Sequence, residues 1–173
     1  MARDYDPLTK ILHWLVFLLV AAQYAVGELM PHIGRGAQDA GLIHLHISLG
    51  AAVMAAIVVA LGWRIIHPVP QTPEIAPWQQ RLATATHWLM YLLILVMTVL
   101  GWAATDFRGW PVTLFGVIPL PALANKGDAW AHTAGDVHSF LVNVLLALVV
   151  VHVAAALYHH FVARDRVLRR MLP

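Results

Sequence analysis

The chain has 173 residues, of which 60% are hydrophobic and only 12% are charged, and its mean hydropathy is +0.70. A soluble domain carries about twice that charged fraction, so the composition excludes an ordinary soluble fold and indicates a membrane protein. The formal net charge of +2 gives no reason to expect a nucleic-acid partner. The basic C-terminal segment RDRVLRR is explained by membrane topology and contact with anionic lipid.

Four apolar runs, at residues 11–30, 42–66, 82–104 and 137–162, each reach the length of about 20 residues that a membrane-spanning helix needs. We therefore expect an all-α fold, a transmembrane four-helix bundle with up-down-up-down topology, in which residues 1–173 form a single membrane domain. No segment has a convincing strand pattern. The longest connection, 105–136, is too apolar for a disordered linker, and we expect it to lie at the outer membrane surface as a partial cap.

The basic residues predict the orientation. Eight of them flank the ends of the runs on the side of the two termini: Arg3, Lys10, Arg64, Arg81, Arg164, Arg166, Arg169 and Arg170. The opposite side carries only Arg35, Arg108 and Lys126. Because cytoplasmic loops are enriched in Lys and Arg, we expect both termini in the cytoplasm.

Two histidines in the last run, His138 and His152, are fourteen residues apart. Fourteen residues fall only about 40° short of four helical turns, so both imidazoles share one helix face. They are also separated by roughly 21 Å along the axis, which is most of the hydrocarbon thickness of a bilayer. The last run can therefore carry one metal ligand near each membrane surface.

The predicted depths of the histidines form two layers, and ionisable groups inside spans usually face the bundle interior. The inner layer holds His13, His87 and His152, and the outer layer holds His44, His46, His132 and His138. The chain has no cysteine, which excludes thiolate iron–sulfur sites and covalent c-type haem. Imidazoles on both faces of a haem iron give a six-coordinate electron-transfer centre. We predict an inner pair, His13 with His152, and an outer pair, His46 with His138, whose irons lie roughly 20 Å apart.

Each layer has a rival ligand. His44 and His46 are about 200° apart on a helix, so they cannot both face the bundle. Gly50 lies on the same face as His46 and leaves room for a flat macrocycle, which favours His46 over His44. His87 is the main rival in the inner layer.

The roles of some other polar residues stay open. His159 follows His152 by seven residues, and it either contacts a haem propionate or a quinone head group or, like His160, reaches the membrane interface as a solvated side chain. Gln23 and Asn143 are polar inside predicted spans, and we expect them to form helix-to-helix hydrogen bonds.

Four segments, in chain order, resemble the bacterial cytochrome b561 family: YDPLTKILHWLVFLLV, IHLHISLGA, THWLMYLLI and VHVAAALYHHFVARDRVLRRMLP. The resemblance covers nearly the whole chain. It implies a four-helix protein of the bacterial inner membrane with two haem b groups, and His13, His46, His138 and His152 match the haem-ligand positions of that family. His87 stands at a position that the family commonly occupies on its third helix.

The resemblance also implies chemistry, because some family members resemble superoxide oxidases that pass an electron from periplasmic superoxide to ubiquinone. Superoxide is a small anion, which cationic side chains can steer. Arg35, Arg108 and Lys126 are the candidates for this role, and no residue is assigned to catalysis beyond them. Lipid, quinone and superoxide are the expected partners, and a protein partner is not required.

Two other functions remain open from the sequence. The chain can be a haem-bearing anchor subunit that relays electrons between a partner dehydrogenase or hydrogenase and the quinone pool, with the apolar connection 105–136 as its docking surface. It can also be a histidine-lined metal or proton transporter without haem. A relay works in both directions, so the sequence does not predict the direction of electron flow.

Overall fold

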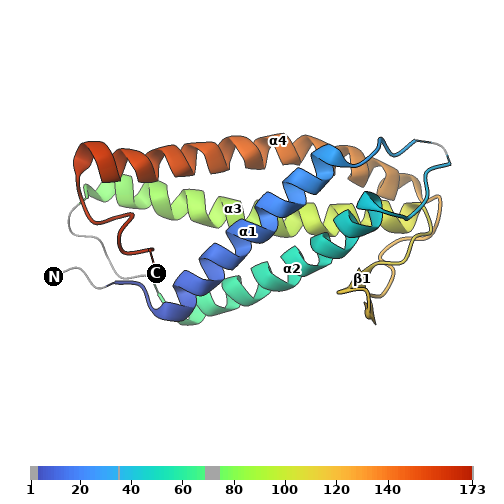
Figure 1. Ribbon diagram of the computed structural model, residues 1–173, viewed down its shortest axis with the longest axis horizontal. Coiled ribbons are helices and arrows are strands. Elements are labelled where there is room, and N and C mark those ends of the chain that lie inside the picture. Colours follow the sequence, from blue (N-terminus) through green and yellow to red (C-terminus); the bar gives the residue numbers. More distant parts are fainter. Residues whose placement is uncertain (1–3, 35, 69–74, 173) are drawn as a thin grey trace.

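The computed structural model describes residues 4–34, 36–68 and 75–172. Four long helices dominate it: α1 (Pro7–Leu29), α2 (Leu42–Ile66), α3 (Pro77–Phe107) and α4 (Ala129–Tyr158), which continues into a π-helical turn, η1 (His159–Ala163). All four are long and apolar enough to cross a bilayer. Figure 1 shows that α1 begins, and α4 ends, at the same end of the bundle. The basic residues place that end in the cytoplasm.

The helix ends are set by short capping sequences. The Asp6 carboxylate accepts a hydrogen bond from the Thr9 backbone N–H at 2.9 Å, and Pro7 occupies the first turn, where its missing N–H costs nothing. At the start of α3, the Gln79 side chain accepts a hydrogen bond from the backbone N–H of Ala76 at 3.0 Å. These caps let α1 and α3 begin before their apolar runs do.

The helices therefore differ in length from the apolar runs. The run at 42–66 has the bounds of α2, whereas α1 begins four residues before the run at 11–30 and ends one residue before its end. The polar turns 77–81 and 105–107 belong to α3, and 129–136 belong to α4. Polar turns at helix ends do not add to an apolar run, so α1, α3 and α4 begin before the runs that predicted them.

The helices pack in chain order, and one seam between them stays open. The backbones of α1 and α2, of α2 and α3, and of α3 and α4 approach one another closely, whereas α1 and α4 make no such approach within the described part of the chain. At the outer end Ala103, Ala131 and Ala134 are buried together, because small side chains let α3 and α4 come close. The bundle is thus tight along α3–α4 and open along α4–α1.

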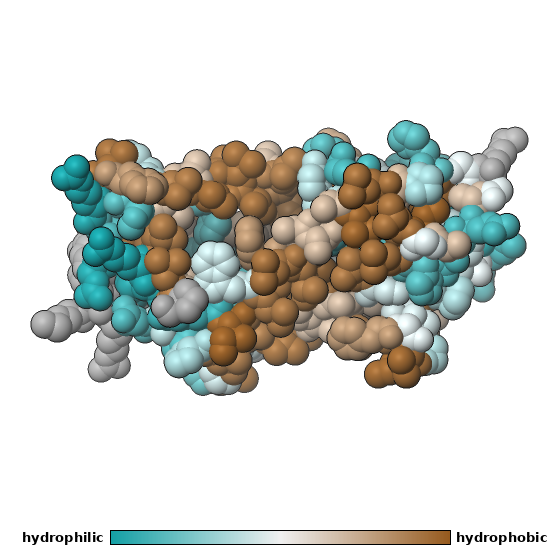
Figure 2. Space-filling view, in the orientation of Figure 1, coloured by the Kyte–Doolittle hydropathy of each residue, from teal (hydrophilic) through white to brown (hydrophobic). Residues whose placement is uncertain are grey.

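The apolar outer surface of the bundle is the surface that lipid covers. Large apolar side chains on α1, α2 and α4, such as Leu18, Val59 and Val151, are more than half exposed in the isolated chain. Figure 2 shows apolar residues over the middle of the visible face and hydrophilic residues gathered toward its two ends. This division matches a protein whose long axis crosses the bilayer.

One element was not expected from the sequence. The outer connection contains a hairpin of two two-residue strands, β1 (Thr113–Leu114) and β2 (Ile118–Pro119), so the prediction that the chain has no strand was wrong. Segments this short fall below the length at which alternation can be recognised in a sequence. The fold remains all-α in class, with this hairpin as an addition at the outer end.

Candidate functional site

The inner histidine layer lies near the cytoplasmic end of the bundle. His13 of α1 and His152 of α4 face each other across the open seam, and their ring centres are 6.3 Å apart. His87 of α3 also contacts His152, with ring centres 5.2 Å apart and ring planes nearly perpendicular. Three helices therefore contribute one imidazole each to this layer.

The outer layer has a similar arrangement at the other end of α4. His46 of α2 and His138 of α4 have ring centres 6.3 Å apart, at an interplanar angle of 86°. His44, two residues before His46, turns away from the bundle, is half exposed, and contacts Asp39 at 3.0 Å. The two histidines thus lie on different faces of α2, as their spacing requires.

The ring separations allow a test of whether a haem iron would fit. An imidazole nitrogen lies about 1 Å from its ring centre and about 2 Å from a first-row metal that it binds, so two imidazoles on opposite sides of one metal have ring centres about 6 Å apart. The pairs His13–His152 and His46–His138 have this separation. The contact between His87 and His152, at 5.2 Å, is too short to admit a metal between the rings. The distances therefore favour His13 over His87 as the inner partner of His152.

The described residues contain no cluster of three or more His, Asp or Glu side chains that could hold a bare metal ion. Such a cluster is what a protein-only zinc or iron site needs, because a bare ion takes at least three protein ligands. Two imidazoles facing each other are the donor set that would hold a haem.

A hydrogen bond fixes the tautomer of His138. Its Nδ1 lies 2.9 Å from the carbonyl oxygen of Met97 on α3, and only an N–H can donate there. The neutral ring then has its lone pair on Nε2, the atom available to a metal. The Nδ1 of His46 is buried and has no hydrogen-bond partner among the described residues. His46, like His138, would bind a metal through Nε2, so its unpaired Nδ1 does not distinguish a ligand from a packing residue.

Two glycines make room for the outer histidine rings. A Cβ on Gly101 of α3 would lie 3.0 Å from both Cε1 and Nδ1 of His138, and a Cβ on Gly27 of α1 would lie 3.3 Å from Cε1 of His46. Gly50, which we expected to leave room for a macrocycle, lies against the Gln23 side chain, 3.3 Å from its Nε2.

The sequence reasoning missed Gly27 and Gly101, although a signal was present. Gly27 follows His13 by fourteen residues, and Gly101 follows His87 by fourteen residues. The same interval separates His138 from His152. Each glycine therefore lies on the face of its own helix that carries the inner histidine, about four turns nearer the outer end.

Gln23 and Asn143, for which we expected helix-to-helix hydrogen bonds, differ in their hydrogen-bond partners. The Gln23 side chain of α1 donates from Nε2 to the backbone carbonyl of His46 on α2 at 3.0 Å, so the predicted helix-to-helix bond is confirmed. Asn143 donates instead to the Ser139 carbonyl of its own helix, so the prediction for Asn143 was wrong. A polar side chain near a helix surface can reach the carbonyl four residues earlier, which the sequence pattern does not distinguish from a bond across helices.

A large cavity follows the open seam and contains both histidine layers. Its volume is 1830 Å³, and His13, His46, His138 and His152 all line it. This volume exceeds the roughly 300–1,000 Å³ of a pocket for one drug-sized ligand, so two large planar groups can share it.

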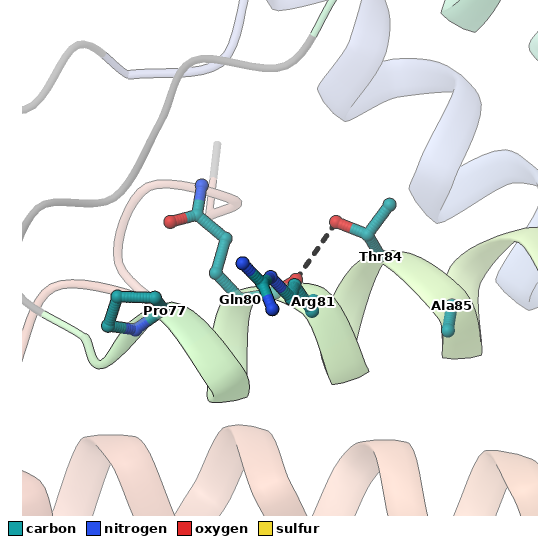
Figure 3. A pocket seen from close by; sticks show the side chains of 5 residues that line it. All are labelled: Pro77, Gln80, Arg81, Thr84 and Ala85. Atoms are coloured by element: carbon teal, nitrogen blue, oxygen red, sulfur yellow. Dashed lines mark hydrogen bonds between the residues drawn. The ribbon is translucent and has the colours of Figure 1, made fainter.

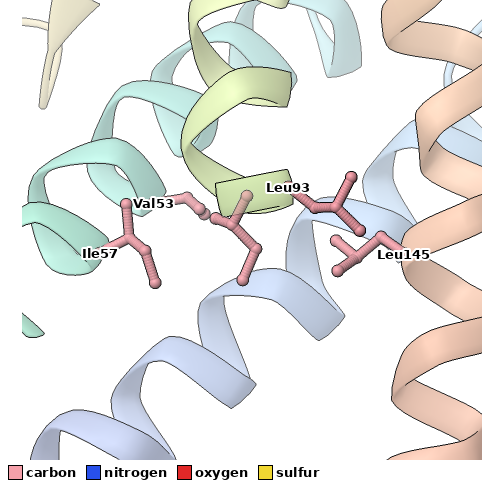
Figure 4. Packing of buried hydrophobic residues seen from close by; sticks show 5 residues of the cluster. Val53, Ile57, Leu93 and Leu145 are labelled. Atoms are coloured by element: carbon pink, nitrogen blue, oxygen red, sulfur yellow. The ribbon is translucent and has the colours of Figure 1, made fainter. Parts of the chain in front are cut away.

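The interior between the histidine layers is apolar. A cluster of buried side chains lies there, with Val53 and Ile57 from α2, Leu93 and Ile94 from α3 and Leu145 from α4. Figure 4 shows Leu93 and Leu145 close together and Val53 and Ile57 on the neighbouring turns of α2. Leu145 is seven residues from both His138 and His152. This cluster keeps water and charge out of the region between the two layers.

Another cavity, of 530 Å³, lies on the cytoplasmic end of α3 and contains no histidine. Its lining residues are Pro77, Gln80, Arg81, Thr84 and Ala85 (Figure 3). The dashed line in Figure 3 is the bond from the Thr84 hydroxyl to the Gln80 carbonyl of the same helix. With no histidine among its lining residues, this cavity is not a candidate haem site.

The outer face carries charges of both signs. Arg108 donates to the backbone carbonyls of Ile33 and Gly34 at 3.1 and 3.3 Å, so it joins α3 to the outer α1–α2 connection. The Lys126 side chain is exposed, and its Cδ lies close to Gly109. Arg35 lies outside the described residues. Glu28 and Asp136 line the same cavity as Arg108, so carboxylates at the outer end oppose the cations there.

The segment after η1 lines the cytoplasmic end of the cavity. Arg164 adopts a left-handed conformation, φ 54°, which ends the helix and turns the chain back toward α1. His159 Nδ1 lies 2.5 Å from Oδ2 of Asp165, and the Trp14 indole donates to the Met171 carbonyl at 3.0 Å. His160 lies in the same turn, where its buried Nδ1 has no hydrogen-bond partner in the described part of the chain.

Comparison with known proteins agrees with this architecture. Residues 4–173 match the family model described as prokaryotic cytochrome b561. Cytochrome b561 homolog 2 of Escherichia coli is 32% identical, over 97% of this chain and 90% of that protein. The probable superoxide oxidase CybB of Yersinia pestis is 31% identical, over 100% of this chain and 98% of that protein. Cytochrome b562 of Cereibacter sphaeroides is 32% identical, over 97% of this chain and 94% of that protein.

A family match over nearly the whole chain, four apolar helices and a haem-compatible histidine arrangement lead to one conclusion. The chain belongs to the prokaryotic cytochrome b561 family, as a multi-pass electron-transfer protein of the bacterial inner membrane that uses haem b.

Proposed function

We propose that the protein holds two haem b groups and uses them to oxidise superoxide at the periplasmic face and reduce ubiquinone in the membrane. The observation that carries the proposal is the pair of histidine contacts, His13–His152 and His46–His138, each with ring centres 6.3 Å apart. One haem would be held by each pair. When bound, the haems would supply one-electron carriage between the two faces of the membrane.

The reaction balances as two one-electron oxidations coupled to one two-electron reduction. Two superoxide anions each lose one electron and leave as dioxygen, and one quinone takes up two electrons and two protons to become the quinol. The relative from Yersinia pestis that carries the name probable superoxide oxidase supports superoxide as the donor. Because the two histidines of each pair would both be used to hold a haem, superoxide would have to approach from the outer end of the cavity, where Lys126 and Asp136 lie.

The chain's own residues have three tasks in this scheme. Met97 orients the His138 ring through its carbonyl, which holds the proton of the neutral ring on Nδ1 and leaves Nε2 to face the group that would be bound. The apolar cluster around Leu145 keeps water from the region between the two layers. At the cytoplasmic end His159 lines the cavity and is hydrogen-bonded to Asp165, so we assign to this pair the contact with the quinone head group and the supply of protons.

The outer charges would tune the encounter with superoxide. Lys126 is exposed and attracts the anion, whereas Asp136, whose side chain is 76% exposed, repels it. We expect Lys126→Gln to slow the reaction and Asp136→Asn to accelerate it, each by about twofold at low salt. High ionic strength should remove both effects, because exposed charges are then screened.

The test uses the purified protein with its haems, a short-chain ubiquinone and enzymatically generated superoxide. The proposal predicts quinol formation that superoxide dismutase abolishes and that the two charge variants change in opposite directions. Quinol formation that continues in the presence of dismutase would overturn superoxide as the donor. A stoichiometric partner protein, together with no superoxide-dependent activity, would favour the haem-bearing anchor subunit. A purified protein without a Soret band would exclude both functions.

A further inference from the structure

The outer hairpin presents apolar side chains at a strained turn. Residues 110–124, from which it is built, include no charged residue. The strands pair with Thr113 opposite Pro119 and Leu114 opposite Ile118, and the Val117 N–H donates to the Leu114 carbonyl at 3.2 Å.

The turn itself has an unusual sequence. Phe115 and Gly116 both have positive φ, 55° and 68°. The pairing of Leu114 with Ile118 leaves a three-residue loop, and a bulky side chain at a position with positive φ is sterically strained in any surroundings.

The side chains at the tip are not covered by any other part of the described chain. Phe115 is 71% exposed, Val117 is 79% exposed and Ile118 is 55% exposed. A folded soluble surface rarely groups three large apolar side chains on a protruding turn without a function for them. The exposed apolar tip therefore needs an apolar environment outside the described chain.

The base of the hairpin is held firmly against the bundle. Val112 is only 5% exposed, and its carbonyl accepts a hydrogen bond from the Leu120 N–H at 2.9 Å. The Asp106 carboxylate accepts hydrogen bonds from the backbone N–H groups of Leu123 and Ala124 at 2.6 and 3.3 Å. The tip is therefore carried by an anchored base and cannot retract into the bundle without breaking these bonds.

The position of the hairpin identifies what covers its tip. β1 packs against α2, and Figure 1 shows the hairpin beside the outer end of α2, outside the outline of the four helices. Leu42 and Leu45, in the first turn of α2, are exposed on the surface that lipid covers. The tip is thus continuous with the lipid-facing surface of the bundle, at the level where the outermost turn of a spanning helix meets the head groups.

We propose that the tip of this hairpin, Phe115, Val117 and Ile118, inserts into the outer leaflet at the boundary between head groups and acyl chains. A two-stranded hairpin leaves backbone groups unpaired on its outer edges, so it can enter the interface but not the hydrocarbon centre. The absence of charge predicts binding to neutral lipid, without a requirement for anionic head groups. The inserted tip would anchor the outer end of α2, the helix that carries His46.

A protein partner fits the same surface poorly. A standard interface uses about 20–30 residues on each side, and the exposed tip offers three large side chains. The lipid surface needs no such area, because each inserted side chain contributes separately.

The absence of native cysteine gives a direct test, since a single introduced thiol is the only one in the chain. We compare Phe115→Cys with Lys126→Cys, an exposed position in the same connection, in the haem-loaded protein reconstituted into phosphatidylcholine liposomes with the outer face accessible. Each is treated with a charged maleimide, which stays in water, and with a neutral maleimide, which enters the bilayer. Val117→Cys serves as an independent second tip variant, and haem content is measured for all three.

We expect the charged maleimide to modify Phe115→Cys and Val117→Cys about tenfold more slowly than Lys126→Cys. Because a thiol in an apolar environment is less ionised and reacts more slowly with any maleimide, the quantity compared is the ratio of the neutral-reagent rate to the charged-reagent rate, which should be about tenfold higher at the two tip positions than at Lys126→Cys. Equal rates with the charged reagent at all three positions would overturn the proposal, because the tip would then lie in water. Slow reaction at the tip with the same ratio as at Lys126→Cys would overturn it in favour of packing within protein. Protection in native membranes that disappears in liposomes would overturn it in favour of a protein partner. None of these outcomes depends on superoxide or quinone chemistry.

Discussion

The glycine against His138 gives the sharpest prediction about the outer site. In Gly101→Ala the new Cβ would lie 3.0 Å from both Cε1 and Nδ1 of His138, where ordinary van der Waals contact begins at 3.4 Å. The ring must therefore move by a few tenths of an ångström. Such a movement strains the bond between His138 Nδ1 and the Met97 carbonyl, which is 2.9 Å long and sets the ring orientation.

The magnitude follows from overpacking. Forcing an extra methyl group into a filled site costs about 1–3 kcal/mol, which corresponds to a loss of roughly 5- to 150-fold in affinity for a group that His138 binds. The alanine also favours the helix by about 1 kcal/mol, so the bundle itself should not unfold. The expected result is a selective loss at the outer site.

The assay is the rate at which each variant loses haem to an excess of apomyoglobin, followed by absorbance. Gly27→Ala and Gly62→Ala serve as controls for the size of the steric effect. A Cβ on Gly27 would lie 3.3 Å from His46, and a Cβ on Gly62 would meet nothing within 4 Å. We expect fast loss of one haem in Gly101→Ala, a smaller acceleration in Gly27→Ala and wild-type behaviour in Gly62→Ala. Indistinguishable rates in Gly101→Ala and Gly62→Ala would refute the role of the glycine in shaping the site.

Three further predictions concern the scaffold. Asp6→Ala removes the cap of α1 and should lower the free energy of unfolding by about 1 kcal/mol. The pKa of Asp6 is lowered below 3.8, chiefly by the hydrogen bond from the Thr9 hydroxyl. The difference from wild type should therefore be present above pH 3.8 and vanish as the pH falls through the lowered pKa, which unfolding in detergent at several pH values would measure. Leu145→Ala should cost about 2–5 kcal/mol and lower the melting temperature, since Leu145 is 6% exposed. Both haems should be retained, because Leu145 lies seven residues, about two helical turns, from both His138 and His152. Asp106→Ala leaves two backbone N–H groups without their acceptor and should speed proteolysis of the connection 108–128 without changing haem content; unchanged cleavage would show that the hairpin base is held by other contacts.

Much of the architecture could be predicted because the membrane imposes it. A spanning helix needs a long apolar run, and four such runs predicted the four helices. The caps that lengthen α1 and α3 depend on single residues such as Asp6 and Pro77, and a hydropathy pattern does not contain them. The hairpin was missed because two-residue strands are held by a turn and by contact with α2, neither of which leaves a periodic pattern.

The candidate site, like the fold, could be predicted only in part from the sequence. Helical periodicity predicted that His138 and His152 share a face and that His44 and His46 do not, and both statements follow from geometry within one helix. The close contact of His87 with His152, the seat of the His46 ring against Gly27 and the bond from His138 to the Met97 carbonyl all join different helices. Such contacts depend on how far apart the helices settle, and this distance is not encoded in the spacing along any one of them.

The number and location of the haems test the central claim most directly. Pyridine-haemochrome quantitation should find two haem b groups per chain in the wild type and about one in each of His46→Ala and His152→Ala, because each substitution removes one ligand of a different pair. The remaining haem should differ between the two variants in its redox potential. Retention of both haems in either variant would contradict the pairing. Retention in His46→Ala would make His44 the candidate ligand, and retention in His152→Ala would make His87 the candidate.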